Sequence, residues 1–404
     1  MIILFIRCGC VHVNSFRGVS FNNFPCKLEG EETAFMKKSV QRKATSDKSV
    51  FCYFGSWATY RGGIAKFEVF NIDTTLCTHM VYMYTGLKNG VIASLDEYND
   101  YEENYGKGNI KKFVTLANNG GVKALVGIGG WNEGSVKYSL MAATPASRET
   151  FADSAVAFIQ KFGFHGLELD WEYPTANGGS ANDKENYVLL LQTLSEKFAA
   201  NNLILSVGVA GSPNVATSAY DFAAVAKYAD HIIIFSYDYH TAYDGITAVS
   251  APLEANDQLN VDFSVHQWLN AGVPSDKIIV GVAFYGRTNH LADPNRHDLG
   301  APVTGPGTAG QFTQEAGLLT YYEYCTYLYW TVEHSDDPLY TYAYHDSEWI
   351  SYDDSQTIEG KGQYIVSNSL GGMMVFSLES DDFGGNCGPI YPLLNAVNKG
   401  LGRL

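Results

Sequence analysis

Short apolar segments rich in β-branched and aromatic residues alternate along the chain with longer stretches that have a helical period. From residue 50 onward there are eight such segments, at 50–55, 78–84, 123–129, 166–172, 203–209, 231–237, 277–285 and 372–377. Most are continuous apolar runs, which is typical of parallel strands that are covered on both faces. The pattern therefore predicts eight buried strands.

Helical patterns lie between these segments. They span 109–118, 147–162, 184–201, 220–228, 261–271 and 391–399. Strand followed by helix, repeated around eight strands, predicts an α/β protein. We expect a closed (β/α)8 barrel, a TIM barrel, rather than an open sheet.

One interval breaks this rhythm. Between the seventh and eighth segments the chain is far longer than a loop and one helix require. The part from 288 to 350 is dense in tyrosine and contains the turn-forming run Gly305-Pro306-Gly307. We therefore expect a barrel over residues 50–404, interrupted after its seventh strand by a small α+β insertion domain at 288–350.

Three carboxylates alternate within the fourth apolar segment. Glu168, Asp170 and Glu172 are separated by Leu169 and Trp171. Alternation is the period of a strand, so the three acids should share one face, about 7 Å from each to the next. A solvated edge strand could also carry charges in this way, but the apolar residues between them indicate a buried strand. Acids on a buried strand point to a functional site.

In a barrel of this kind the chemistry lies at the C-terminal ends of the strands. Besides the three acids, the residues expected there are Tyr53, Tyr84, Trp131, Tyr173, Tyr237, Asp238, Tyr285, Arg287 and Phe376. Acids and flat rings suit glycoside cleavage, in which an acid protonates the leaving oxygen and negative charge steadies a cationic sugar centre. Crowding of carboxylates also raises the pKa of at least one of them. A general acid that works near neutral pH needs such a raised pKa, because it must still hold its proton there.

The run His165-Gly166-Leu167-Glu168-Leu169-Asp170-Trp171-Glu172 resembles the Asp-Gly-x-Asp-x-Asp-x-Glu signature of glycoside hydrolase family 18, the chitinases and chitinase-like lectins. Three further runs resemble the family's Ser-x-Gly-Gly-Trp, Met-x-Tyr-Asp and Tyr-Gly-Arg motifs. They are Gly127-Ile128-Gly129-Gly130-Trp131, Phe235-Ser236-Tyr237-Asp238 and Tyr285-Gly286-Arg287. The four motifs occur in the family's order, and the resemblance extends over nearly all of residues 50–400.

The resemblance implies hydrolysis of chitin or chito-oligosaccharides by a substrate-assisted, retaining mechanism. Glu172 would protonate the glycosidic oxygen while the substrate's own N-acetyl oxygen attacks the anomeric carbon. Asp170 would hold the acetamido N–H, Glu168 would modulate Asp170, and Tyr237 would donate to the acetyl oxygen. The residues expected to bind the sugars are Tyr53, Tyr84, Trp131, Tyr173, Phe235, Asp238, Tyr243, Tyr285, Arg287 and Phe376. For Tyr53 and Tyr84, packing inside the barrel is an equal alternative.

Seven cysteines are present, and the last four are Cys52, Cys77, Cys325 and Cys387. Four cysteines allow three pairings. The family resemblance implies Cys52 with Cys77, Cys325 with Cys387, and an extracellular, secreted protein, since disulfides persist in oxidising compartments. We expect residues 1–49 to be a leader or disordered segment outside the fold, although the apolar run at 1–6 is shorter than the core of a secretory signal.

Charge and motif content limit the partners. The net charge of −16 argues against nucleic acid and anionic membranes, which would be repelled. No apolar run reaches the roughly 18 residues that span a bilayer. No metal and no cofactor are expected, since Cys8 and Cys10 lack a second pair of ligands and the histidines show no ligand spacing. We expect a monomer that cleaves chitin chains internally.

Five positions depart from the family pattern. His165 and Glu168 replace aspartates, and Phe235 replaces a methionine. Phe376 replaces a tryptophan that usually floors the sugar site, and Tyr243 stands where the family usually has another tryptophan. The longer Glu168 and the smaller ring of Phe376 predict slow turnover and weaker binding. The alternative is a non-catalytic chitinase-like lectin or growth-factor-like protein that binds carbohydrate. Such proteins usually lack the residue at Glu172, so its retention favours the hydrolase.

Overall fold

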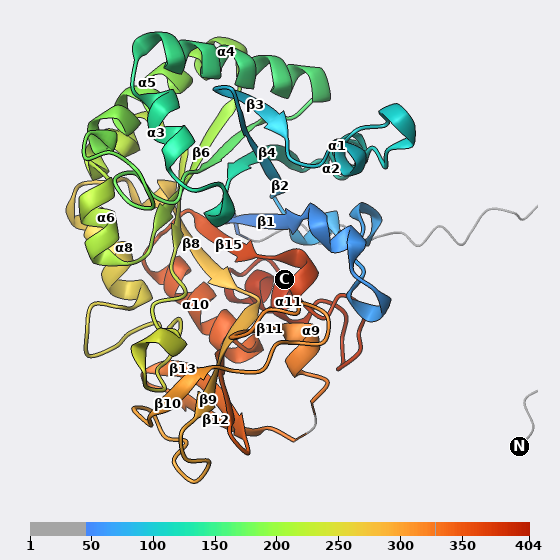
Figure 1. The fold of residues 1–404 in the computed structure, drawn as a ribbon, viewed down its shortest axis with the longest axis vertical. Helices are drawn as coiled ribbons and strands as arrows, with labels where there is room; N and C mark the ends of the chain where they lie inside the picture. Colours follow the sequence, from blue (N-terminus) through green and yellow to red (C-terminus); the bar gives the residue numbers. More distant parts are fainter. Residues whose placement is uncertain (1–45, 328) are drawn as a thin grey trace, which may run out of the picture. The chain divides into compact units, whose positions relative to one another are not determined.

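Eight parallel strands close into a barrel in the computed structural model, which describes residues 46–327 and 329–404 (Figure 1). They are β1 (Ser49–Gly55), β2 (His79–Lys88), β4 (Lys123–Gly129), β5 (Gly166–Asp170), β6 (Ile204–Ala210), β7 (His231–Phe235), β8 (Ile278–Ala283) and β15 (Gly372–Phe376). Each pairs with the next, and β15 pairs with β1 to complete the ring. The predicted (β/α)8 barrel is confirmed. Of the expected leader, only 46–49 is described, and Ser49 opens β1.

Helices cover the outside of this barrel. Those that the sequence pattern predicts are α2 (Asn109–Gly120), α4 (Pro145–Phe162), α5 (Asp183–Asn201), α7 (Phe222–Tyr228), α8 (Val261–Asn270) and α11 (Pro392–Gly400). The shorter elements α1 (Glu97–Asp100), α3 (Val136–Ala142) and α6 (Pro213–Ala219) lie between them, and β3 (Val91–Ser94) extends β2 as an antiparallel hairpin. Between β1 and β2 the chain forms short 3-10 helices, the first of them η1 (Ser56–Tyr60).

The pattern does not predict helix α10 (Ser355–Ser367), which precedes β15. Gly360 and Gly362 weaken its helical signal, because glycine is a poor helix former. A Cβ at Gly362 would lie 2.7 Å from the backbone of Gly400 in α11. The glycine therefore serves the close packing of two helices, which local propensity cannot reveal.

The insertion is a separate antiparallel sheet with strand order β10-β9-β14-β13-β12, and β11 pairs with β9. Its elements are β9 (Tyr285–Leu291), β10 (Val303–Pro306), β11 (Leu318–Thr320), α9 (Tyr321–Tyr324), β12 (Thr331–Asp336), β13 (Leu339–His345) and β14 (Glu348–Tyr352). The strands β9, β10, β12 and β13 lie at the bottom of Figure 1. Because β9 begins two residues after β8 ends, its first residues stay at the rim of the barrel.

Within the described part of the chain two disulfides are formed, and both have the pairing that the family resemblance implies. Cys52 in β1 bonds to Cys77, which precedes β2. Cys325 bonds to Cys387, and so ties the end of α9 to the loop between β15 and α11. Among the described residues, no helix combines the length and the apolar character needed to cross a membrane.

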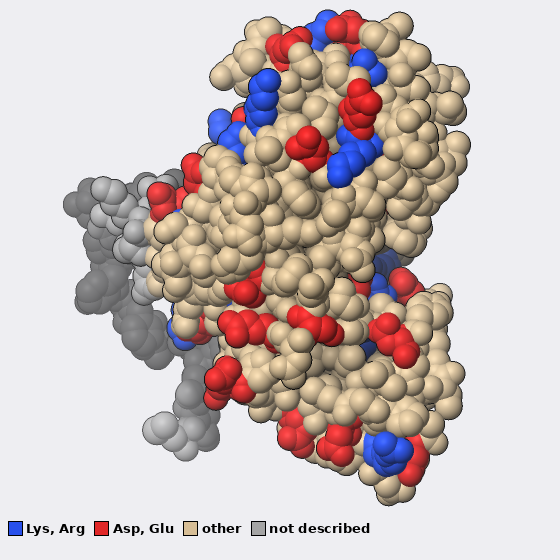
Figure 2. Space-filling model, turned by 90° about the vertical axis from the view of Figure 1, so that its left-hand side faces the viewer, with Lys and Arg blue, Asp and Glu red and all other residues tan. Residues whose placement is uncertain are grey.

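The acidic composition is visible on the molecular surface. Figure 2 shows one face of the protein, on which Asp and Glu predominate in the lower half, while the upper half carries both signs of charge. The net charge of the whole chain is −16. A field of this sign favours neutral ligands over polyanions.

Strand β5, which carries two of the three acids, packs too closely against β6 to allow a side chain at Gly166. A Cβ there would lie 2.2 Å from the backbone oxygen of Ile204. By contrast, a Cβ at Gly62 would meet no atom within 4 Å. The start of β5 is thus fixed by backbone-to-backbone contact.

We expect Gly166→Ala to destabilise the protein by about 1–3 kcal/mol or more, because neither backbone can yield without distorting the barrel. Gly62→Ala is the matched control and should leave the unfolding midpoint unchanged or slightly raised. Thermal or urea unfolding followed by circular dichroism measures both. Equal midpoints for the two variants would contradict the packing described here.

Candidate functional site

The three carboxylates meet at the C-terminal end of β5. Glu168 is fully buried and Asp170 is 1 % exposed, while Glu172 is partly exposed. The strand ends at Asp170, two residues before the predicted end, so Glu172 lies on the turn that follows. Strand alternation therefore places the first two acids, and the turn places the third.

Two features fix this turn. Gly129, at the end of β4, has φ +120°, and a Cβ there would lie 1.9 Å from the carbonyl oxygen of Asp170. Trp171 points into the core and donates its indole N–H to Ser135 Oγ at 2.9 Å, and that hydroxyl donates to the carbonyl oxygen of Tyr173 at 2.9 Å. The glycine and the buried indole thus hold the backbone on both sides of Glu172.

Burial is the largest cause of a raised pKa in all three acids. It raises the pKa of Glu168 to about 8 and that of Glu172 to about 7, and it raises the pKa of Asp170 well above its usual range. Nearby negative charge adds to the effect, since Glu172 raises the pKa of both Asp170 and Glu168. The cluster therefore retains protons near neutral pH.

Hydrogen bonds lower the pKa values of these acids, but they offset the effect of burial only in part. Tyr84 donates its hydroxyl to Asp170 Oδ2 at 2.6 Å and lowers the pKa of that carboxyl. The Tyr53 hydroxyl also lowers the pKa of Glu168, although its geometry falls short of a hydrogen bond. Asp170 Oδ1 and both carboxyl oxygens of Glu168 are buried and have no hydrogen-bond partner among the described residues. Asp170 Oδ1 is thus an acceptor that a ligand N–H could satisfy.

A second polar cluster lies beside the carboxylates and joins the barrel to the insertion. Asp238 follows β7 in the left-handed region, at φ +58°. It accepts hydrogen bonds from the Tyr285 hydroxyl at 2.7 Å and from Arg287 Nε at 2.7 Å, and Arg287 Nη2 bonds to its other oxygen in a two-pronged ion pair. Tyr285 and Arg287 belong to β9, so the first strand of the insertion forms one wall of the site.

Aromatic rings connect the two clusters. Phe376, at the end of β15, lies with its ring centroid 6.2 Å from Tyr53, 6.2 Å from Tyr237 and 6.3 Å from Tyr285. Phe235 is only 6 % exposed and sits below Tyr237, inside the barrel. Burial raises the pKa of the Tyr237 hydroxyl well above its usual range, so this group remains a hydrogen-bond donor.

Other predicted residues lie at the rim. Trp131, in η6 (Trp131–Glu133), is 64 % exposed, and Tyr243, in η7 (Ala242–Asp244), is 90 % exposed, so neither belongs to the inner cluster. Trp57 is not among the predicted site residues. Its ring stacks on Tyr84 with centroids 6.1 Å apart, and it remains 39 % exposed. Its position just after β1 is the sequence signal that could have identified it.

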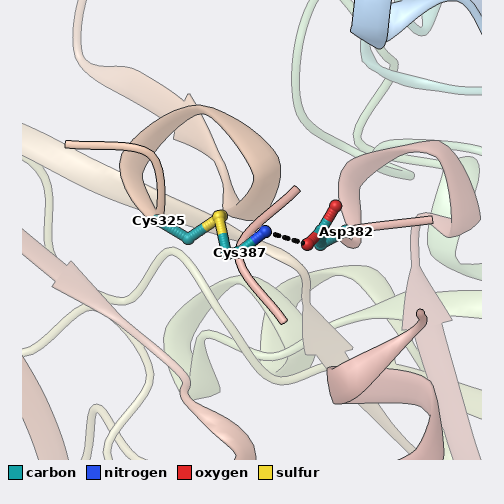
Figure 3. Close-up of side chains that lie close together, drawn as sticks. All are labelled: Cys325, Asp382 and Cys387. Carbon is teal, nitrogen blue, oxygen red and sulfur yellow. Dashed lines mark hydrogen bonds between the residues drawn. A yellow bond between two sulfur atoms is a disulfide. The ribbon is translucent and has the colours of Figure 1, made fainter. Parts of the chain in front are cut away.

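Among the described residues, one group has side chains close enough to share a metal ion, namely Cys325, Asp382 and Cys387 (Figure 3). The two sulfur atoms are bonded to each other, and Asp382 accepts the backbone N–H of Cys387 at 2.7 Å. A disulfide offers no thiolate ligand. This group is therefore a structural crosslink with a hydrogen-bonded carboxylate beside it.

Comparison with known proteins gives a consistent result. Residues 49–381 match the family model described as Glycosyl hydrolases family 18. The chain is 39 % identical over 361 residues to Probable chitinase 2 of Drosophila melanogaster, covering 84 % of this chain and 74 % of that protein. It is 36 % identical over 383 residues to Probable chitinase 10 of the same species, which covers 90 % of this chain but only 16 % of that much longer protein.

Solved structures show the same likeness. The Group IV chitinase of Ostrinia furnacalis superposes with a TM-score of 0.84 at 40 % identity, over 88 % of this chain and 99 % of that one. Human YKL-39, described as a pseudo-chitinase with retained chitooligosaccharide binding properties, gives a TM-score of 0.81 at 30 % identity, over 88 % of this chain and all of that one.

We expect the stability of Glu168→Gln relative to the unmodified protein to rise with pH. An unfolded glutamate releases its proton near its ordinary pKa of 4.5, whereas the folded protein keeps this proton up to about pH 8. Stability from the protonated carboxyl is therefore complete below about pH 4.5 and is lost as pH rises toward 8. The neutral amide escapes this loss, so its advantage should grow by up to about 1.4 kcal/mol per pH unit in that window.

Urea unfolding at several pH values between 4 and 9 measures this difference. Glu185→Gln, which replaces an exposed glutamate of α5, controls for the loss of one carboxyl from the protein surface. A difference between Glu168→Gln and the unmodified protein that stays constant with pH would contradict the described environment of Glu168.

Proposed function

The chain belongs to the glycosyl hydrolases of family 18, and we propose that it hydrolyses the β-1,4-linked N-acetylglucosamine chains of chitin with retention of configuration. The observation that carries this proposal is the cluster of Glu168, Asp170 and Glu172, whose raised pKa values keep protons available near neutral pH. Relatives named as chitinases, over most of this chain's length, support the substrate class.

In the proposed reaction Glu172 is the general acid. With a pKa of about 7 it carries a proton that it can give to the glycosidic oxygen as the bond to the anomeric carbon breaks. The carbonyl oxygen of the substrate's acetamido group forms a new bond to that carbon and closes an oxazolinium ring. Glu172, now ionised, then takes a proton from the water that opens the ring. Two displacements at one carbon retain its configuration.

Asp170 and Tyr237 hold the acetamido group during these steps. Asp170 Oδ2 is occupied by Tyr84, and the unpartnered Oδ1 accepts the acetamido N–H. The positive charge that develops on the ring favours the charged form of Asp170, which balances it. Tyr237, which keeps its proton, donates to the acetyl oxygen. Glu168 is buried beside Asp170, and its negative charge raises the pKa of Asp170.

The remaining residues bind the sugars. Phe376 forms the apolar floor, while Tyr173, Asp238, Tyr285 and Arg287 supply polar contacts. Tyr53 is fully buried, so it packs against Phe376 inside the barrel and does not face the sugar. Phe235 supports the floor from inside the barrel. Trp131 and Tyr243 lie exposed at the rim, where they can stack on sugars beyond the cleavage point. Exposed rings at the rim suit a long chain that lies across the site and is cleaved internally.

Slow turnover and a secreted monomer are further parts of the proposal. Glu168 and Phe376 replace a shorter acid and a larger ring of the family pattern, so the acid is less well tuned and the floor is smaller. Both disulfides support an oxidising compartment. The α+β insertion, built on the antiparallel sheet between β8 and α10, would form one wall of the substrate cleft.

We expect Glu172→Gln to lower kcat on a fluorogenic chito-oligosaccharide by at least about 100-fold, because the amide cannot donate the required proton. Binding of the unlabelled oligosaccharide, followed by calorimetry, should persist. Glu185→Gln is the control and should leave kcat unchanged. If the unmodified protein binds but cleaves no faster than Glu172→Gln at any pH from 4 to 9, the protein is a lectin and the hydrolase proposal is wrong.

We expect Phe376→Trp to bind chito-oligosaccharides about two- to tenfold more tightly, since an indole offers more stacking area than a phenyl ring. The dissociation constant is measured in the Glu172→Gln background, so that the ligand is not consumed. Unchanged or weaker binding would show that Phe376 does not form the sugar floor.

A further inference from the structure

A buried lysine outside the site joins three parts of the protein. Lys361 lies on α10, and its side chain is fully buried. Its ammonium group donates to Asp353 Oδ1 at 2.8 Å, to Asp353 Oδ2 at 2.6 Å and to the carbonyl oxygen of Ala251 at 2.7 Å. An ammonium has three N–H donors, and all three are used. They connect a barrel helix, the residue that follows β14 of the insertion, and the loop between β7 and α8.

That loop begins with the site residues Tyr237 and Asp238. Ser250, next to Ala251, donates its backbone N–H to Ser351 Oγ at 2.9 Å and accepts the backbone N–H of Tyr239 at 2.9 Å. The start of the loop is therefore hydrogen-bonded to its segment at 250–251. That segment is in turn anchored to the insertion and, through Lys361, to α10.

The Tyr237 ring contacts Phe235, Tyr285 and Phe376, with ring centroids 5.9, 6.2 and 6.2 Å away. A small cavity of about 10 Å³ also borders this ring, and its lining includes Ser250, Tyr285 and Asp353. The hydrogen-bonded loop holds the backbone from which the Tyr237 ring extends. A shift of the backbone at 250–251 would be transmitted to it through Tyr239.

A buried ion pair is a poor source of stability, since the cost of removing both charges from water offsets their attraction. We propose that Lys361 is a positioning residue for the reaction: by holding Ala251 and Asp353 together, it fixes the loop that places the Tyr237 hydroxyl against the acetyl oxygen. This inference rests on the proposed function, in which Tyr237 makes that contact.

A double-mutant cycle between Lys361→Met and Tyr237→Phe tests the proposal, with kcat and KM measured on a chito-oligosaccharide. Lys361→Met alone should lower kcat about 10-fold or more with little change in KM, because the contact with Tyr237 is made in the transition state. In the Tyr237→Phe background the same change should lower kcat by less than about threefold. Lys399→Met, which removes a lysine from an exposed ion pair between α11 and α10, is the control and should leave kcat unchanged.

Ser351→Ala is the second variant, because it removes one hydrogen bond to the loop and leaves the buried charges paired. Its effect on kcat should also be non-additive with Tyr237→Phe. Additive effects of both variants, or loss of the folded circular dichroism spectrum in both at the assay temperature, would overturn the positioning role in favour of a purely structural one. If the unmodified protein shows no turnover above Glu172→Gln, the proposed function fails first, and this inference fails with it.

Discussion

The cost of burying several carboxylates at one end of a closed barrel governs this structure. A charged carboxylate loses much of its hydration on burial, so Glu168 and Asp170 favour their protonated forms. The barrel can bear this cost because β5 is held on both sides, by β4 and by β6. Rigid packing and proton retention are therefore two results of the same burial. On an open, solvated strand the same three acids would be ionised near neutral pH. They would then lack the proton that the proposed acid catalysis needs.

The insertion contributes residues to the candidate site. Arg287 and Tyr285 stand on its first strand, and both bind Asp238 of the barrel. The disulfide between Cys325 and Cys387 and the buried pair of Lys361 and Asp353 tie the insertion back at two other places. With several attachments, the sheet behaves as a fixed wall.

Much of the barrel could be predicted from the sequence, because each buried strand is a continuous apolar run. The run at 123–129 matches β4 at both ends. Predictions failed where long-range contact outweighs local pattern. The apolar run through Trp171 hides the end of β5, since that indole is buried for its bond to Ser135 and not as part of a strand.

Glu168 and Asp170 could be predicted to share one site because strand alternation brings them together, whereas Glu172 is placed by the turn that follows β5. The pairing of Asp238 with Arg287 depends instead on how the insertion folds back, and no local period shows it. Trp57 is not among the predicted site residues, although it follows β1 directly. It lies on a 3-10 turn and stacks on Tyr84, which donates a hydrogen bond to Asp170. Motif resemblance supplied the proposed roles of the three acids, Asp238 and Arg287, which periodicity could not.

Phe235 and Gly208 share one small volume. A Cβ at Gly208 would lie 2.4 Å from the Phe235 ring and 3.0 Å from Glu168 Oε1. The phenylalanine ring therefore excludes every larger residue at position 208 while Glu168 occupies its present place. A slimmer side chain at position 235 would open this volume, so the residue that position 208 tolerates is decided by an uncharged neighbour as well as by the buried acid.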